Sequence, residues 1–232
     1  MNLNSGLGLS DLQAILLDFD GTLVRLCIDF DAMKRRVREA ALALGADLTG
    51  CDRLYTLELI ERVSEQFSRQ GQKLAETFQR QAEAAVIDEE MKGAAAAEVY
   101  PGVPELLRLL RARNIRVGIV TRNCRQAVAQ IMARNALHAD VLLTRDDVPR
   151  VKPDPLHLEI ALCALQASPS RTLMVGDHPS DVEAGRAAGT WTAGILNDNR
   201  PPDYFAAVQP DAVLTSVLGI PAYLAAHPLR RD

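Results

Sequence analysis

The sequence predicts an α/β protein whose core is a doubly wound, Rossmann-like parallel sheet and which carries an inserted all-helical domain. Three observations support this prediction: short apolar runs recur along the chain, helical segments alternate with them, and residues 24–99 show helical periodicity alone. Strands that are covered on both faces read as continuous apolar runs, as they do in parallel sheets. Alternation of such runs with helices is typical of doubly wound folds.

Six apolar runs are predicted to be strands, namely residues 14–17, 116–120, 140–143, 172–175, 190–195 and 212–214. Four helices are predicted between them, over residues 104–113, 124–136, 156–165 and 181–188. Asn123 is the candidate N-cap of the second helix, because its side chain can accept a hydrogen bond from the first turn. Gly189 suits the C-terminal cap of the fourth helix.

The stretch of residues 24–99 shows no convincing strand and is predicted to form helices over residues 31–44, 53–69 and 73–91. A stretch of about 75 residues is too long for a structureless loop in a compact domain. We therefore expect two domains: an α/β core made of residues 1–23 and 100–232, and a helical domain made of residues 24–99.

The composition argues against several classes of protein. The chain has 232 residues, of which 48% are apolar and 24% charged, as in ordinary globular proteins. A net charge of −4 disfavours a nucleic-acid partner, and no apolar run is long enough to span a membrane. The four cysteines form no C-x-x-C pair, and residues 1–10 lack a secretory signal. We therefore expect a cytoplasmic protein with reduced thiols, as a monomer or a homodimer.

Polar side chains follow the predicted strands at their carboxyl ends, where open α/β sheets bind ligands. Asp18 and Asp20 follow the first strand, Thr121 follows the second, and Asp177 follows the fourth. Residues two apart on an extended chain point to the same side, so the carboxylates of Asp18 and Asp20 are expected to lie together. Such carboxylates repel unless a cation intervenes or one is protonated. The oxygen-rich set favours Mg²⁺ over zinc.

Four motifs occur in order at these strand ends. They are Asp-Phe-Asp-Gly-Thr-Leu-Val at 18–24, Ile-Val-Thr-Arg-Asn at 119–123, Val-Lys-Pro-Asp-Pro at 151–155, and Val-Gly-Asp-His-Pro-Ser-Asp at 175–181. Together they make the chain similar to the haloacid dehalogenase superfamily, in particular to its phosphatases with a helical cap, such as the phosphoglycolate phosphatases. The resemblance covers nearly the whole chain, from residue 14 to about residue 214.

The resemblance implies a role for each matching catalytic residue. Asp18 would attack phosphorus and form an aspartyl phosphate, and Asp20 would protonate the leaving group and then activate water. Thr121 and Lys152 would complete the catalytic set by holding the phosphate and supplying a positive charge.

The same resemblance implies the ligands. The backbone N–H groups of Arg122 and Asn123 would bind phosphate oxygens at a helix N-terminus. Mg²⁺ would be held by Asp18, the backbone carbonyl of Asp20 and Asp177, and Asp181 would orient its water ligands from behind.

We therefore expect a magnesium-dependent phosphatase that hydrolyses a small organic phosphate monoester, similar to phosphoglycolate, as its small-molecule partner. The acid at Asp20 favours phosphoryl transfer over dehalogenation. A phosphotransferase or mutase acting on a sugar phosphate is one alternative, and a non-catalytic regulatory protein on the same fold is another. The sequence departs from the usual motif from Leu23 to Cys27, and there Arg25 is the candidate contact for a substrate anion.

Overall fold

The structure is a computed structural model that describes residues 7–25, 27–197 and 200–229. The chain divides into two compact units, one made of Met1–Leu26 with Ala97–Asp232 and the other of Cys27–Ala96. The second unit is therefore an insertion in the chain of the first. Each unit is described separately below.

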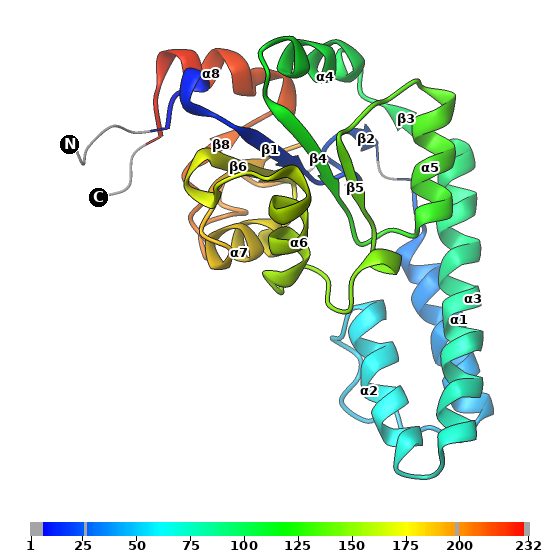
Figure 1. Cartoon of the computed structure of the whole chain (residues 1–232). Coiled ribbons are helices and arrows are strands. Elements are labelled where there is room, and N and C mark those ends of the chain that lie inside the picture. Colours follow the sequence, from blue (N-terminus) through cyan, green and yellow to red (C-terminus); the bar gives the residue numbers. More distant parts are fainter. Residues whose placement is uncertain (1–6, 26, 198–199, 230–232) are drawn as a thin grey trace. The chain divides into compact units, whose positions relative to one another are not determined.

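The first unit is built on a six-stranded sheet in the order β5-β4-β1-β6-β7-β8, and all of its neighbouring strands are parallel (Figure 1). The strands are β1 (Ala14–Leu17), β4 (Arg116–Val120), β5 (Val141–Leu143), β6 (Thr172–Gly176), β7 (Trp191–Ile195) and β8 (Ala212–Leu214). All six predicted strands are present, and the predicted α/β fold class is confirmed. These strands appear in the sequence as continuous apolar runs because both faces of the sheet are covered.

The register of the sheet brings three strand ends to one edge. Leu17, the last residue of β1, pairs with Ile119 of β4 on one side and with Val175 of β6 on the other. The residues that follow these strands therefore emerge beside one another, although the end of β1 is more than a hundred positions from the other two in the sequence. This edge is where a doubly wound fold binds its ligand.

Helices cover both faces of the sheet. They are α4 (Val103–Ala112), α5 (Arg125–Arg134), α6 (Leu156–Leu165), α7 (Pro179–Ala187) and α8 (Ile220–Ala226), with short 3-10 helices η1 (Leu9–Asp11), η2 (Arg145–Asp147), η3 (Pro169–Arg171) and η4 (Val217–Gly219). Leu16 and Met174 of the sheet pack against Leu158 and Leu162 of α6 in one buried cluster. In Figure 1, α4 and α8 lie on the opposite side of the sheet from α6 and α7.

The start of α5 differs from the prediction. Cys124, not Asn123, is the N-cap, and its Sγ accepts a hydrogen bond from the N–H of Ala127 at 3.5 Å. The side chain of Asn123 is engaged elsewhere, because its Oδ1 accepts from the Cys124 N–H at 2.8 Å. Capping preference favours Asn over Cys in general, whereas here the Nδ2 of Asn123 donates to Oδ2 of Asp20 at 2.9 Å and holds the side chain away from the cap position.

A two-stranded ribbon joins the ends of the insertion, and the prediction that residues 24–99 contain no strand is wrong. Strand β2 (Val24–Arg25) pairs antiparallel with β3 (Glu98–Val99), so that Val24 lies opposite Val99 and Arg25 opposite Glu98. Two residues are too few to show a strand period, and the pairing depends on a partner far along the chain. Both strands belong to the first unit.

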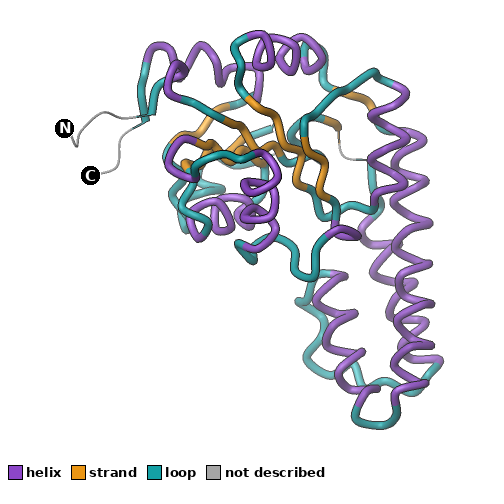
Figure 2. Tube along the Cα trace, viewed as in Figure 1, coloured by secondary structure: helices purple, strands orange, loops and turns teal. Residues whose placement is uncertain are grey.

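The second unit consists of α1 (Phe30–Ala43), α2 (Thr56–Ser68) and α3 (Gln72–Ala96), joined by loops (Figure 2). Their apolar faces form one buried cluster, in which the rings of Phe67 and Phe78 meet edge to face with centroids 5.4 Å apart. Such a pair adds specific ring geometry to the apolar area that it buries. Among the described residues, no helix combines the length and the apolar character that crossing a bilayer requires.

Replacing Phe78 by Ala should destabilise the helical unit by about 3–5 kcal/mol, because the ring is fully buried and its removal leaves a cavity. Hydrogen exchange followed by mass spectrometry should show faster exchange in α2 and α3. Leu42→Ala on α1, where the side chain is 57% exposed, is the matched control and should leave exchange unchanged. Equal protection in the two variants would contradict the packing described.

Candidate active site

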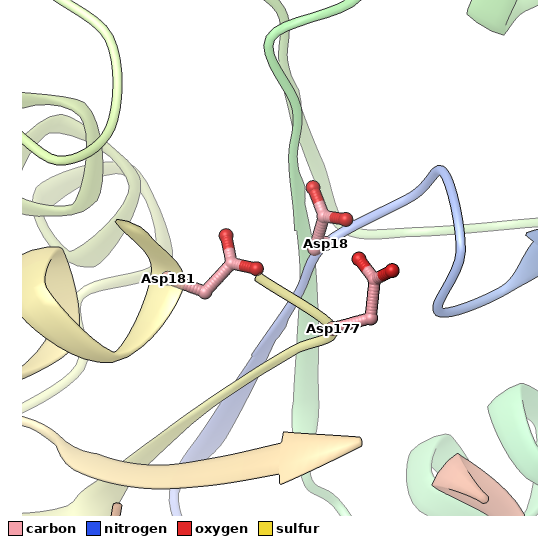
Figure 3. A group of neighbouring side chains, drawn as sticks. All are labelled: Asp18, Asp177 and Asp181. Atoms are coloured by element: carbon pink, nitrogen blue, oxygen red, sulfur yellow. The ribbon is translucent and has the colours of Figure 1, made fainter. Parts of the chain in front are cut away.

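Three buried carboxylates meet at the carboxyl edge of the sheet. Asp18 follows β1, Asp177 follows β6, and Asp181 lies in the first turn of α7 (Figure 3). One oxygen of each lies within 4.8 Å of the other two, which is close enough for a shared metal ion. The strand ends position the first two residues, and the short turn from β6 into α7 brings in the third.

Lys152 lies against this cluster from the loop before α6. Its Nζ is 2.7 Å from Oδ1 of Asp18 and 2.6 Å from Oδ1 of Asp181, and its side chain is only 1% exposed. An uncompensated charge at such a depth is costly, so the lysine and the carboxylates need one another. When all three are ionised, the buried carboxylates outnumber this one buried ammonium group and leave an excess of negative charge.

The pKa values of these buried groups are shifted by burial and by their neighbouring charges. Burial, assisted by Asp181 and Asp177 and opposed by Lys152, raises the pKa of Asp18 to about 8. Burial and then Asp181 raise the pKa of Asp177 as well. Burial by itself would lower the pKa of Lys152, but Asp18 and Asp181 outweigh it and the pKa is raised. A hard divalent cation fits this donor set, because it would stabilise the ionised carboxylates.

Two glycines make room for the carboxylates. Gly21 has a φ of +83°, and a Cβ built there would lie 2.2 Å from Oδ2 of Asp177. A Cβ on Gly176 would lie 2.0 Å from Oδ2 of Asp181. The absence of a side chain at these positions is therefore a condition for the cluster, and Gly21 also supplies a left-handed backbone conformation that other residues rarely adopt.

The Asp20 carboxylate points to a different group of residues. Its Oδ2 accepts hydrogen bonds from Nδ2 of Asn123 at 2.9 Å and from the hydroxyl of Thr121 at 3.5 Å. Among the described residues, it does not belong to the three-carboxylate group. The extended geometry assumed for Asp18 and Asp20 ends within this segment, because the carbonyl of Phe19 accepts hydrogen bonds from the N–H groups of Leu23 and Val24 in a turn. The site thus holds its acidic groups in two environments.

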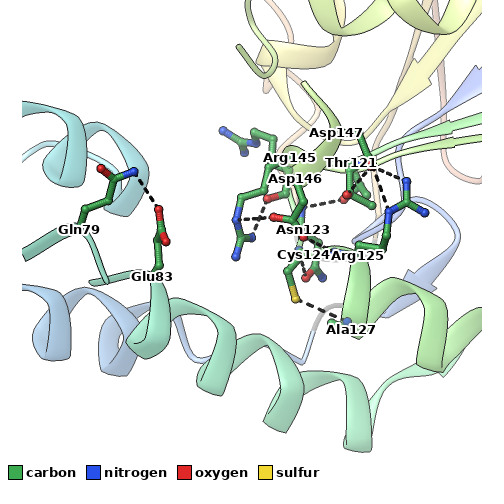
Figure 4. Close-up of polar contacts among 12 residues, drawn as sticks. Gln79, Glu83, Thr121, Asn123, Cys124, Arg125, Ala127, Arg145, Asp146 and Asp147 are labelled. Carbon is green, nitrogen blue, oxygen red and sulfur yellow. Dashed lines mark hydrogen bonds and ion pairs between the residues drawn. The ribbon is translucent and has the colours of Figure 1, made fainter. Parts of the chain in front are cut away.

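The loop between β4 and α5 is held in shape by its own hydrogen bonds (Figure 4). The N–H of Asn123 donates to Oγ1 of Thr121 at 3.0 Å, and the carbonyl of Arg122 accepts from Arg145 at 3.1 Å. At the start of α5, Arg125 pairs with Asp147 at 2.6 Å. A phosphate oxygen bound by the Asn123 N–H, as the sequence predicts, would have to replace Thr121 as acceptor.

Two residues at this edge were not predicted from the sequence. Nδ2 of Asn197 donates to Oδ2 of Asp177 at 3.1 Å and to the carbonyl of Gly21 at 3.4 Å, and the guanidinium of Arg200 lies 3.5 Å from the same Asp177 oxygen. Asn197 follows β7, so the rule that ligands bind at strand ends could have found it. For Arg200 the sequence offers no comparable signal.

Arg25, the predicted contact for a substrate anion, is exposed on β2 opposite Glu98. No described contact joins it to the carboxylate cluster, so its role stays a prediction.

Two histidines near the site have structural partners. His178 is the N-cap of α7: its Nδ1 accepts from the Ser180 N–H at 3.2 Å, and its own N–H donates to Oδ2 of Asp181 at 3.0 Å. Burial and then Arg122 lower the pKa of His178 to about 4. His157 on α6 is fully buried with Nε2 3.3 Å from the carbonyl of Leu143, and burial and then Lys152 lower its pKa to about 4.

Comparison with known proteins gives this geometry a context. The family model described as haloacid dehalogenase-like hydrolase matches residues 12–189. Pyrophosphatase PpaX of Anoxybacillus flavithermus (strain DSM 21510 / WK1) is 35% identical over 134 residues, which are 54% of this chain and 62% of that protein. The matched region therefore spans less than two thirds of the length of this curated relative.

Solved structures share the fold. The structure of a predicted phosphoglycolate phosphatase from Haemophilus somnus 129PT has a TM-score of 0.60 at 22% identity and covers 90% of this chain and 96% of its own. The β-phosphoglucomutase of Clostridium difficile has a TM-score of 0.64 at 15% identity and covers 90% and 93%. Because one fold carries both names, it does not by itself distinguish a hydrolase from a mutase.

Replacing His157 by Gln should remove part of the acid sensitivity of folding. The folded pKa of about 4 lies below the ordinary value of 6.5, so the unfolded chain binds the proton first and stability is lost as the pH falls from about 6.5 to about 4. This residue should cost the wild type about 2 kcal/mol between pH 7 and pH 5, measured by urea denaturation. His138→Gln, at an exposed histidine, should keep the full slope, and an equal slope in His157→Gln would refute the assignment.

Proposed function

The chain belongs to the haloacid dehalogenase-like hydrolase family, and on that premise we propose that it is a Mg²⁺-dependent phosphohydrolase with Asp18 as its nucleophile. One observation carries this proposal: the buried ammonium of Lys152 joins Asp18 to Asp181 beside Asp177, while the Asp20 carboxylate is bound by Asn123. This arrangement offers a nucleophile, a cation site and a separate acid at one strand edge. The helical unit, inserted between β2 and β3, is assigned as the cap within the same proposal.

Asp18 is suited to attack phosphorus because one of its oxygens is already fixed. Lys152 binds Oδ1 at 2.7 Å, which leaves Oδ2 as the attacking atom. A bond forms between this oxygen and phosphorus while the bond from phosphorus to the leaving oxygen breaks, giving an aspartyl phosphate. Water then attacks that phosphorus and releases Asp18 and inorganic phosphate.

Asp20 supports this role because its hydrogen-bond partners differ from those of Asp18. Held by Asn123 and Thr121, it donates a proton to the leaving oxygen in the first step and accepts one from water in the second. It has to be protonated at the start, and two carboxylates in different surroundings can hold different protonation states.

Asp18, Asp177 and the backbone carbonyl of Asp20 would hold Mg²⁺. When bound, it neutralises the charge of the phosphoryl group and lets an anionic nucleophile approach it. Both oxygens of Asp181 already have partners, Lys152 at 2.6 Å and the His178 N–H at 3.0 Å. This suits a residue that orients the metal's water ligands without binding the metal directly.

The substrate we propose is a small phosphate compound. The names of the relatives suggest two kinds, a phosphate ester of a small carboxylic acid such as phosphoglycolate and a diphosphate. Both carry a second anionic group close to the transferred phosphoryl group. Transfer of phosphate to a sugar, as in a mutase, would yield an isomerised sugar phosphate without free phosphate, so analysis of the products separates the two reactions.

Purified protein should release phosphate from p-nitrophenyl phosphate, phosphoglycolate and inorganic diphosphate with Mg²⁺, and EDTA should abolish this release. Asp18→Asn should lower kcat at least about a thousandfold, because the nucleophile is lost. Asp20→Asn should lower it about 10²–10⁴-fold. Asp11→Asn, at an exposed aspartate, is the control and should keep full activity. Wild-type activity in Asp18→Asn would end the proposal.

Binding of Mg²⁺ should release a proton from Asp18. Because its folded pKa of about 8 lies above the ordinary value of 3.8, metal-free stability is lost as the pH rises from about 4 through about 8, and Mg²⁺ should restore it. The apparent Kd for Mg²⁺ should rise about tenfold for each pH unit below 8.

Calorimetry at pH 7, in two buffers that differ in ionisation enthalpy, measures the released proton directly. Asp18→Asn is the control and should release none. Equal proton release in both proteins would show that another group supplies the proton.

A further inference from the structure

A stack of aromatic side chains holds Arg200 at the edge of the carboxylate cluster. Phe205 is buried with Val182 and Val208, and its ring meets that of Tyr204 edge to face with centroids 5.0 Å apart. The guanidinium of Arg200 lies over the Tyr204 ring, 4.4 Å from its centroid. An arginine stacked in this way has little side-chain freedom left to lose when it binds a ligand.

The contact of Arg200 with the cluster is long for an ion pair of this kind. The guanidinium nitrogen is 3.5 Å from Oδ2 of Asp177, whereas charge-assisted hydrogen bonds usually measure about 2.7–2.9 Å. The same oxygen already accepts from Asn197 at 3.1 Å. Asn197 therefore orients the Asp177 carboxylate, and Arg200 contributes mainly its positive charge.

Most of the N–H donors of Arg200 remain available to bind a ligand. A guanidinium has five N–H donors, and within the described residues Asp177 is the one hydrogen-bond acceptor recorded for this side chain. The side chain is 31% exposed, so solvent and ligands reach it. A planar set of donors of this kind matches phosphate and carboxylate groups.

We propose that Arg200 is a specificity-determining residue that binds a second anionic group of the substrate, next to the phosphoryl group that Asp18 attacks. The ligand class is a compound in which a second phosphate or a carboxylate lies close to the transferred phosphoryl group. This inference rests on the proposed function and deepens it, because it assigns a discriminating contact to a residue outside the four motifs.

The competing explanation is that Arg200 only positions Asp177. The two explanations predict opposite effects on Mg²⁺. A positioning residue would be needed for tight metal binding, whereas a cation that lies against a metal ligand competes with the metal for its charge. Removing Arg200 should therefore leave the Kd for Mg²⁺ unchanged or lower it, as measured by calorimetry without substrate.

The test compares substrates with one and with two anionic groups. Arg200→Ala should raise KM for inorganic diphosphate or phosphoglycolate about 10- to 100-fold, the usual loss for a hydrogen bond to a charged group, and change KM for p-nitrophenyl phosphate less than about threefold. Whichever substrate shows the larger effect identifies the second group as phosphate or carboxylate. Arg200→Lys should restore part of the affinity, since it keeps the charge without the planar donors.

Matched variants check the stack. Tyr204→Leu, which removes the ring under the guanidinium, should raise KM for the same two-anion substrate. Arg108→Ala, at an exposed arginine of α4 that pairs with Glu105, should change nothing. Equal losses for all substrates in Arg200→Ala, or Mg²⁺ binding weakened about tenfold, would overturn the proposal.

A binding measurement separates failure of this inference from failure of the proposed function. If the wild type hydrolyses no phosphate compound, the function fails, but binding with Mg²⁺ can still be measured. Wild type should bind methylenediphosphonate more tightly than methylphosphonate, and Arg200→Ala should lose that preference. A preference retained in Arg200→Ala refutes the assignment, whether or not the protein is an enzyme.

Discussion

The buried ammonium of Lys152 is the interaction on which the site depends. It lies between Asp18 and Asp181, at 2.7 and 2.6 Å, and it ties the end of β1 to the loop before α6 and to the start of α7. Removing one partner of a buried ion pair typically costs about 3–5 kcal/mol, since the remaining charge stays in the interior. These segments have to come together for any of them to be stable there, so assembly of the sheet edge and assembly of the site are one event.

The same site keeps its acidic groups in two environments. Asp18 shares its surroundings with Asp177 and Asp181, and burial there raises its pKa to about 8. Asp20, two residues later, is bound instead by Asn123 and Thr121. Two carboxylates in different surroundings can take different roles, one as a nucleophile and one as an acid. A turn begins at Phe19, whose carbonyl accepts hydrogen bonds from the N–H groups of Leu23 and Val24, and Asp20 lies within it.

The sequence predicted the fold well because burial on both faces leaves a simple signal. All six core strands appeared as apolar runs, and the polar residues after three of them meet at one edge. The ribbon of β2 and β3 was not predicted because strands of two residues are too short to show an alternating pattern of apolar and polar residues. Asn197 was not predicted although it follows a strand end, whereas Arg200 lies beyond any strand end and no local pattern marks its contact with Asp177.

The glycines at positions 21 and 176 bear on how this site can vary in evolution. At each, a Cβ would lie within 2.2 Å of a carboxylate oxygen of the cluster. Glycine is the one amino acid that lacks this atom, so every nonsynonymous change in either codon brings it in. Natural variation at these codons is thus confined to synonymous bases unless the carboxylates move. Arg200 and Tyr204 carry no such restriction, and substrate preference can drift there while the reaction centre stays fixed.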